Sequence, residues 1–384
     1  MAAADRIRRK SEIRKEHQIM PTQPITLARQ ACDTMMRRFA AADLPPAGHF
    51  HYHQGVFLSG VYKTYELTGE EKYFHYMKDW IDSVFTEDGT IKNDYTHGDL
   101  DDIQPGILLY PLLDKTGDGY YRKCIEAVAA QIPDIPLCEC GAFSHKVRFA
   151  GQMWLDGLYM LGPFMSEYGH RFNRPDYLAQ TARHVLLMRE HTRDRTTGLW
   201  KHGWDETRQA HWCDRSTGLA PEFWGRSLGW VSVAILDDLD QLSPSVPGYE
   251  ELRGIVPELL GAICKYQGPD GRWWQVVDKV GAPENWPENS CTCLFAAAIA
   301  KGVRKGVLGK EWLPIAKKAY EGVAASLTWD GEDIQIGNVC VGTGIGDYAF
   351  YCARPCSTND LHGVGAFLLM CAELQQVWGD GNNV

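Results

Sequence analysis

The sequence predicts an all-α protein that folds as a single (α/α)6 barrel, a ring of six helix pairs. Six nearly uncharged, apolar segments alternate along the chain with six amphipathic segments, which is the pattern of a repeated pair of helices. Gly-containing turns follow several of the amphipathic segments, and small residues recur where the apolar helices would crowd together. Helix pairs can stack as an open solenoid or close into a ring, and the small residues favour the ring.

The apolar segments are expected to form the inner ring, because a helix that is apolar on every side is buried. These inner helices are expected at 54–65, 101–113, 152–166, 221–236, 288–300 and 358–372. The amphipathic segments are expected to form the outer ring, at 24–41, 71–85, 118–132, 176–190, 249–266 and 311–325. No Pro- or Ser-rich linker interrupts the alternation, so we expect one catalytic domain over 21–384, preceded by a basic segment over 1–20.

Composition narrows the class of partner. The 384 residues carry a net charge of −10, which argues against nucleic acid or an anionic membrane as the main partner. The sequence contains no run of about 18 uncharged apolar residues, so it predicts no membrane-spanning helix. The basic N-terminal segment lacks the apolar core of a secretory signal, and twelve Cys without a compact framework indicate reduced thiols in a cytoplasm. We expect a monomer or a weak homodimer.

Each expected inner helix begins with a cluster of polar and aromatic residues. In a ring of parallel inner helices these N-terminal ends meet at one mouth, which is concave and made positive by the helix termini. Ser, Asp and Asn would also occur there as ordinary helix caps. Caps do not explain the Trp residues that recur beside them, which are Trp154, Trp224, Trp230 and Trp286. The mouth is therefore predicted to bind a sugar acid.

One carboxylate, Asp156, stands alone among apolar residues in the expected inner helix 152–166. A buried carboxylate must find partners, change its protonation, or serve as a functional acid. A structural Asp that caps a helix is the plain alternative. The convergence of six helix ends on one mouth favours the functional acid.

His49, His51 and His53 alternate, so an extended strand would place them on one face, as a metal site would require. No further ligand follows at the spacing of a known metal motif. We therefore expect these side chains to form hydrogen bonds at the rim, and we expect no metal or other cofactor.

Three segments in order carry a resemblance to a known family. They are 100–106 (LDDIQPG), 152–160 (QMWLDGLYM) and 223–226 (FWGR). They closely resemble the unsaturated rhamnogalacturonyl hydrolases of glycoside hydrolase family 105, and the resemblance runs from about His49 to the last helix. It implies an (α/α)6 barrel without a metal. It also implies a small oligosaccharide substrate, a pectin fragment already cut by a lyase and bearing a 4,5-unsaturated galacturonyl residue.

The resemblance also implies roles for individual residues. Asp156 corresponds to the general acid and base, and Asp101 to its carboxylate partner. Arg226 is expected to bind the substrate carboxylate, because a guanidinium group binds a carboxylate with paired hydrogen bonds. The substrate-contacting residues implied are Tyr52, His145, Lys146, Trp154, His202, Trp224, Arg226 and Trp230.

The implied chemistry needs a protonated carboxyl group. Asp156 would donate a proton to C4 of the double bond and then activate water for attack at C5. Its pKa must then lie above the ordinary value of about 4. Burial beside Trp154 and the neighbouring Asp101 carboxylate are both expected to raise it.

Other readings remain open from the residues alone. An unsaturated glucuronyl hydrolase or a sugar epimerase would use the same barrel, although an epimerase would need His pairs on its inner helices. A non-catalytic carbohydrate-binding protein would keep the groove without the chemistry, and the two intact carboxylates speak against it. Fold alone does not decide between them.

Overall fold

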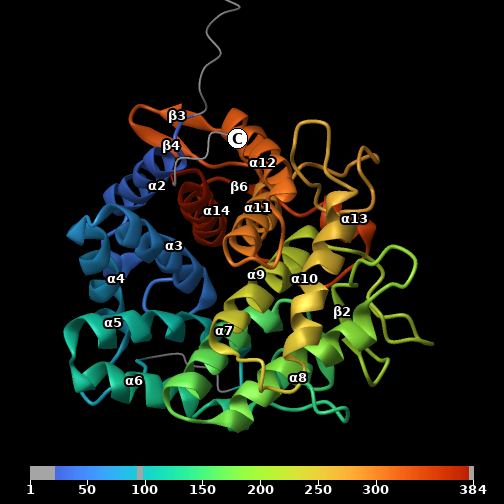
Figure 1. Ribbon diagram of the computed structural model, residues 1–384, viewed down its shortest axis with the longest axis horizontal. Coiled ribbons are helices and arrows are strands. Elements are labelled where there is room, and N and C mark those ends of the chain that lie inside the picture. Colours follow the sequence, from blue (N-terminus) through green and yellow to red (C-terminus); the bar gives the residue numbers. More distant parts are fainter. Residues whose placement is uncertain (1–21, 93–97, 380–384) are drawn as a thin grey trace, which may run out of the picture.

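Helices alternate between an inner and an outer ring in the computed structural model, which describes residues 22–92 and 98–379 (Figure 1). The inner ring consists of α3 (Tyr52–Thr68), α5 (Leu109–Thr116), α7 (Gly157–Arg171), α9 (Gly225–Gln241), α11 (Asn289–Arg304) and α14 (Leu361–Gly379). The outer ring consists of α2 (Pro24–Arg38), α4 (Glu71–Val84), α6 (Gly119–Ala129), α8 (Pro175–Thr192), α10 (Tyr249–Cys264) and α12 (Leu313–Ala325). The predicted (α/α)6 barrel is thereby confirmed.

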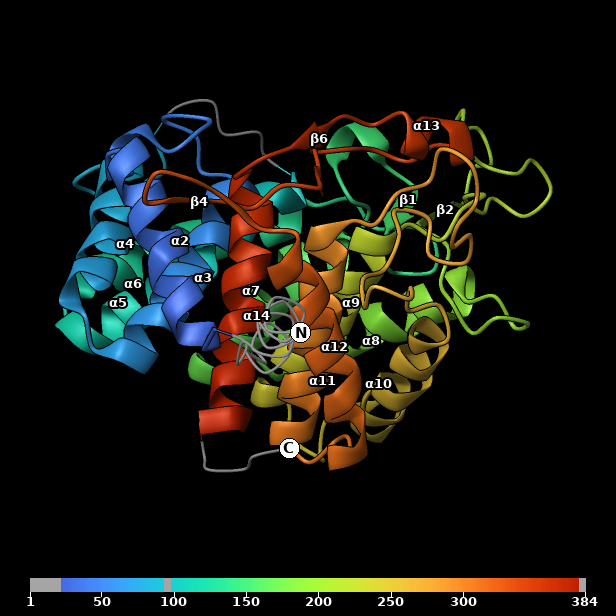
Figure 2. The ribbon, with the colours of Figure 1, turned by 90° about the horizontal axis from the view of Figure 1, so that it is seen from above.

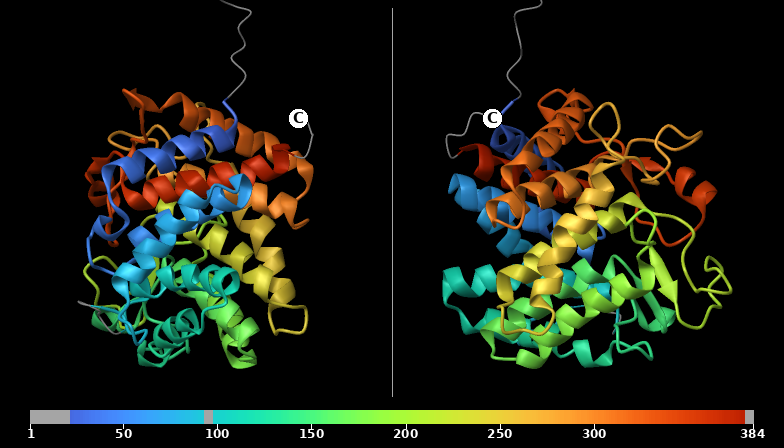
Figure 3. Two further views of the ribbon diagram at one scale, coloured as in Figure 1. Left: turned by 90° about the vertical axis from the view of Figure 1, so that its left-hand side faces the viewer. Right: turned by 45° about the vertical axis from the view of Figure 1, so that its right-hand side comes forward.

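The ring closes where the last inner helix, α14, packs against the first, α3. The outer helix α2 lies along α14 on the outside of this seam (Figure 3). Gly365 of α14 allows the close approach, because a Cβ atom at this position would come within 2.5 Å of the carbonyl oxygen of Val56 on α3. The small residues noted in the sequence therefore serve the packing of inner helices.

Four of the six expected inner helices begin more than one residue later than predicted: the fourth begins at Gly225 rather than 221 and the sixth at Leu361 rather than 358, and the second and third differ in kind. The second is broken into the 3-10 turns η2 (Leu100–Asp102) and η3 (Gln104–Leu108) before α5, since Pro105 lacks a backbone N–H. The third was wrongly expected to be helical from 152. There β1 (Gln152–Trp154) pairs antiparallel with β2 (Gly203–Asp205), and α7 begins only at Gly157.

Short elements cover the end of the barrel where the inner helices begin. Figure 2 shows β1, β2, β6 and α13 on this side. Strand β3 pairs with β4, and β5 pairs with β6. The short elements not yet given bounds are β3 (Thr328–Asp330), β4 (Asp333–Gln335), β5 (Val339–Cys340), α13 (Tyr348–Cys352) and β6 (Cys356–Ser357). The remaining 3-10 turns are η1 (Ala41–Asp43), η4 (Ile132–Asp134), η5 (Val147–Phe149) and η6 (Lys310–Trp312).

The basic segment expected at 1–20 lies outside the described residues. Within the part of the chain that the structure describes, no helix is both long and apolar enough to cross a bilayer. Each of the twelve cysteines is a free thiol.

A buried histidine in the outer ring predicts how stability depends on pH. His184 on α8 is 4% exposed, and its Nδ1 accepts a hydrogen bond from the backbone N–H of Phe143 (3.3 Å). Burial lowers its pKa from 6.5 to about 4. The unfolded chain therefore takes up this proton at higher pH than the folded protein does. The contribution of the neutral His184 to the free energy of unfolding is fully present above pH 6.5. It is lost as the pH drops toward 4, by about 3 kcal/mol over that range.

The measurement is the free energy of unfolding of wild type and His184→Asn between pH 7 and pH 4. Wild type should lose about 3 kcal/mol more than the variant over this range. The exposed His170 provides the control, and His170→Asn should follow the wild-type curve. Parallel curves for wild type and His184→Asn would contradict the assignment.

Candidate active site

Asp156 and His202 lie side by side because β1 pairs with β2. The N–H of Leu155 donates to the carbonyl of His202 (2.9 Å), and Nε2 of His202 lies 2.8 Å from Oδ2 of Asp156. The other ring nitrogen, Nδ1, lies 2.5 Å from the hydroxyl of Tyr351 on α13. His202 is fully buried and the Asp156 side chain is 14% exposed. The pair is therefore held rigidly while the carboxylate stays reachable.

Asp156 occupies the N-cap position of α7, yet its side chain makes no capping hydrogen bond. A structural capping Asp would accept a hydrogen bond from a backbone N–H of the first turn. The carboxylate instead faces His202 at the mouth. The plain structural alternative for Asp156 is thus disfavoured.

The expectation of a raised pKa for Asp156 is wrong for the unliganded protein. Burial does act to raise it, but the charge and hydrogen bond of His202, with the charges of His145 and Arg226, outweigh burial. The pKa of Asp156 therefore lies below its ordinary value of 3.8. Asp101 is not among the groups that shift it most. The carboxylate is ionised until a ligand changes its surroundings.

Asp101 forms its own charged cluster on the other side of His145. Its Oδ2 lies 2.5 Å from Nζ of Lys146, which also reaches Oδ2 of Asp99 at 2.8 Å. Nε2 of His145 lies 3.7 Å from Oδ1 of Asp101. Burial acts to raise the pKa of Asp101, but Lys146, His145 and His51 lower it overall. Asp101 is therefore paired with Lys146 and Asp156 with His202, and His145 acts to lower the pKa of both carboxylates.

Aromatic rings line the space beside Asp156. Trp154 stacks on His145 with centroids 4.7 Å apart and on Phe149 with centroids 5.0 Å apart. Trp224 is buried and stacks on Tyr351, and its Nε1 donates to Oε1 of Gln275 (3.1 Å). Rigid flat surfaces of this kind suit the faces of sugar rings.

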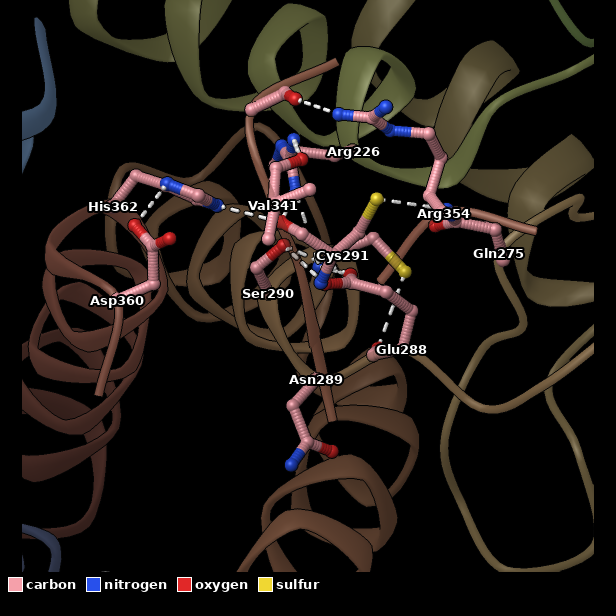
Figure 4. A network of polar contacts seen from close by, with 12 residues as sticks. Arg226, Gln275, Glu288, Asn289, Ser290, Cys291, Val341, Arg354, Asp360 and His362 are labelled. Atoms are coloured by element: carbon pink, nitrogen blue, oxygen red, sulfur yellow. Dashed lines mark hydrogen bonds and ion pairs between the residues drawn. The ribbon is translucent and has the colours of Figure 1, made fainter. Parts of the chain in front are cut away.

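Arg226 is placed differently from the expectation that it reads a substrate carboxylate. The side chain is 2% exposed, and its guanidinium donates to the backbone carbonyls of Cys340 (2.5 Å) and Val341 (2.9 Å). Nη1 also lies 4.0 Å from Oε1 of the buried Glu288 (Figure 4). In this state Arg226 fixes the segment after β5 and contributes a positive charge to the mouth.

Two further residues named in the sequence differ in their access to the mouth. Trp230 is 1% exposed and stacks on Tyr159 at 4.8 Å, so it packs inside the ring of inner helices. Tyr52 is half-buried at the start of α3, and its hydroxyl faces Gly342. Tyr52 thus lies at the mouth, and Trp230 lies beneath it.

The sequence predicted the glycine run 342–346 only as a flexible loop near the mouth, and it did not single out Tyr351. Gly342 lies against Tyr52, Gly344 lies against Trp154, and the N–H of Gly346 donates to the hydroxyl of Tyr351 (3.3 Å). The segment therefore forms a wall across the mouth. Its alternating glycines were visible in the sequence as a flexible loop, but nothing local tied them to Asp156.

A separate cavity of about 220 Å³ lies among the inner helices. Its lining includes Ser59, Gln104, Tyr159 and Lys301, and none of the candidate site residues contributes to it. The mouth around Asp156 is therefore the candidate active site, and this cavity is not.

The matches to known proteins make this chain a glycosidase with an (α/α)6 barrel. The model of Glycosyl Hydrolase Family 88 matches residues 27–377, and the chain belongs to this family. A solved family 105 glycoside hydrolase of C. acetobutylicum superposes with a TM-score of 0.86 and 29% identity, over 91% of this chain and 99% of that one. The resemblance to family 105 is thereby confirmed.

Two curated relatives are similar in sequence. The unsaturated rhamnogalacturonyl hydrolase YesR of Bacillus subtilis is 27% identical over 297 residues, which cover 76% of this chain and 79% of that protein. Protein Atu3128 of Agrobacterium fabrum is 31% identical over 226 residues, which cover 55% of this chain and 96% of that protein.

Proposed function

We propose that the protein removes the 4,5-unsaturated galacturonyl residue from the non-reducing end of lyase-generated rhamnogalacturonan oligosaccharides. The observation that carries the proposal is the Asp156 carboxylate, which is reachable at the mouth and lies 2.8 Å from His202. The similarity to the B. subtilis hydrolase supports the choice of substrate. The twelve free thiols support action in a cytoplasm.

The reaction is a hydration of the double bond. The π electrons of C4=C5 take a proton from Asp156 to form a C4–H bond, and positive charge develops at C5 and the ring oxygen. The Asp156 carboxylate then removes a proton from water as the water oxygen bonds to C5. The hemiketal opens to a 5-keto group, and the hemiacetal at C1 collapses and releases the second sugar with its glycosidic oxygen. One residue thus acts first as acid and then as base, unlike the paired carboxylates of ordinary glycosidases.

The substrate itself supplies the change in protonation that this step needs. Asp156 is ionised in the unliganded protein, because the interactions with His202, His145 and Arg226 that lower its pKa outweigh burial. A bound uronide adds a negative charge and excludes water, and both effects raise the pKa of a nearby carboxylate. Nε2 of His202, at hydrogen-bond distance, is the group from which Asp156 takes its proton.

His202→Gln tests this account of proton supply. The variant keeps a polar side chain but removes the charge and hydrogen bond that lower the pKa of Asp156. We expect kcat to fall by about 10²-fold. The pKa of Asp156 should rise, so the decline of kcat at high pH should move to higher pH. Steady-state kinetics across pH check both effects, with the exposed His211→Gln as the control.

A decline of kcat that stayed in place or moved to lower pH would contradict the role given to His202. An unmoved pH profile together with a full wild-type kcat would show that His202 neither lowers the pKa of Asp156 nor supplies its proton.

Substrate class is tested with two unsaturated disaccharides. We expect unsaturated galacturonyl-rhamnose to lose the ultraviolet absorbance of its double bond and to release rhamnose. An unsaturated glucuronyl disaccharide from a glycosaminoglycan should react with a kcat/KM at least about 10-fold lower. Preference for the glucuronyl compound would transfer the proposal to that class, and loss of absorbance with neither would refute it.

A further inference from the structure

A cluster of two histidines and one aspartate lies on the seam where the barrel closes. Among the described residues, His53, Asp360 and His362 each bring a ligating atom to within 4.8 Å of the other two. His53 belongs to the first turn of α3, Asp360 directly precedes α14, and His362 belongs to the first turn of α14. The first and last inner helices therefore contribute jointly to one group of metal-ligating side chains.

His362 points one ring nitrogen at the carboxylate of this cluster. The residue is fully buried, and its Nε2 lies 3.0 Å from the carbonyl oxygen of Cys340, which requires a proton on Nε2. Its Nδ1 is buried and lies 2.7 Å from Oδ1 of Asp360, a contact that needs either a proton or a metal ion between the two atoms (Figure 4). In the neutral ring this nitrogen carries a lone pair. A lone pair and a carboxylate at this distance repel each other unless a cation lies beside both.

His53 is oriented in the manner of a metal ligand. Its Nδ1 lies 2.9 Å from Nδ1 of His51, which leaves Nε2 as its free nitrogen. The ring of His53 meets that of His362 edge-on, with centroids 5.2 Å apart. Ligating histidines in proteins usually fix their second nitrogen by a hydrogen bond, as both rings do here.

We propose that His53, Asp360 and His362 bind one divalent transition-metal ion of the Zn²⁺ type, which clasps α3 to α14. Two imidazoles and one carboxylate suit Zn²⁺ or Co²⁺, whereas Mg²⁺ and Ca²⁺ prefer oxygen ligands alone. Tetrahedral ligands at about 2.0–2.1 Å from the ion lie about 3.3 Å apart, so small rotations of these side chains complete the site. No metal was expected from the sequence because only His49, His51 and His53 were considered as ligands. Asp360 and His362 come from the other end of the chain.

Co²⁺ is the direct probe, because its visible absorption reports the geometry and donors of its ligands. Tag-free protein is stripped with a chelator and titrated with Co²⁺. We expect one bound ion per chain without the sulfur-to-cobalt band that cysteine ligands produce. His53→Gln and Asp360→Asn should each weaken binding by at least about 10-fold. The exposed His75→Gln serves as the matched control and should bind as wild type does.

Thermal unfolding gives a second readout that needs no substrate, so its failure leaves the proposed hydrolase reaction untouched. Zn²⁺ binds only the folded site and should raise the Tm of wild type and His75→Gln but not of His53→Gln. Wild type without Co²⁺ absorption, equal affinity in His53→Gln, or a sulfur-to-cobalt band would each overturn the proposal. The first of these results would mean that a proton occupies the place between His362 and Asp360.

Discussion

Asp156→Asn should lower kcat by at least about 10³-fold while leaving the affinity for unsaturated galacturonyl-rhamnose within a few-fold of wild type. The amide can neither donate a proton to C4 nor accept one from water. It keeps the size of the side chain and can still pair with Nε2 of His202 across the 2.8 Å contact. The change should therefore affect the transition state rather than binding. Loss of ultraviolet absorbance gives kcat, and calorimetry gives the affinity.

Asp118→Asn is the matched control, because Asp118 also occupies a helix N-cap, that of α6, and is exposed. Asn caps helices about as well as Asp does, so this variant should keep its activity and stability. If Asp156→Asn lost affinity and rate together, Asp156 would be a binding residue. If it kept more than about a tenth of the wild-type kcat, another group would be the acid.

Glu288→Ala should lower the free energy of unfolding by about 3–5 kcal/mol, because it leaves Arg226 buried without a carboxylate partner. Glu288 is fully buried and accepts hydrogen bonds from the N–H groups of Cys291 (2.6 Å) and Cys340 (2.9 Å). Ser290 adds a hydroxyl donor at 2.7 Å. Figure 4 shows this network between the start of α11 and the segment after β5. Urea unfolding of wild type and variant measures the difference.

Glu66→Ala is the control for this stability measurement. Glu66 pairs with Lys63 at 2.8 Å, but both side chains are more than 40% exposed, at 42% and 43%. The pair should contribute no more than about 0.5 kcal/mol. Equal losses in Glu66→Ala and Glu288→Ala would contradict the role of the buried network. Glu288→Ala should also raise KM, since Arg226 and Glu288 together hold the wall of the mouth at 340–341.

The ring of helix pairs was predictable because a segment that is apolar on every side must be buried, and such segments can be recognised directly in the sequence. The N-terminal end of the third inner helix was not. The run at 152–154 is short and apolar, and a buried strand cannot be told from a buried helix by periodicity at this length. The strand forms because it pairs with β2, which lies some 50 residues further along the chain.

The sequence predicted several of the residues that meet at the mouth but not the electrostatics of Asp156. The resemblance placed Asp156 and His202 in one site, yet the direction of the Asp156 pKa depends on a 2.8 Å contact that only the β1–β2 pairing creates. The same is true of Asp101, whose partner in the fold is Lys146. The hydrogen bonds from Arg226 to the carbonyls of Cys340 and Val341 could not be predicted along the chain, and its role as a ligand for the substrate carboxylate stays a prediction.

The central claim is that Asp156 protonates the double bond at C4, and the reaction in D2O tests it most directly. NMR of the product from unsaturated galacturonyl-rhamnose should show a single deuterium at C4, on one face only, formed in step with the release of rhamnose. An enzyme that cut the bond at C1 would release rhamnose first and leave the double bond intact. Rhamnose release ahead of deuterium incorporation would contradict the account, as would deuterium on both faces of C4 in product sampled before the hydrogens beside its 5-keto group exchange with D2O.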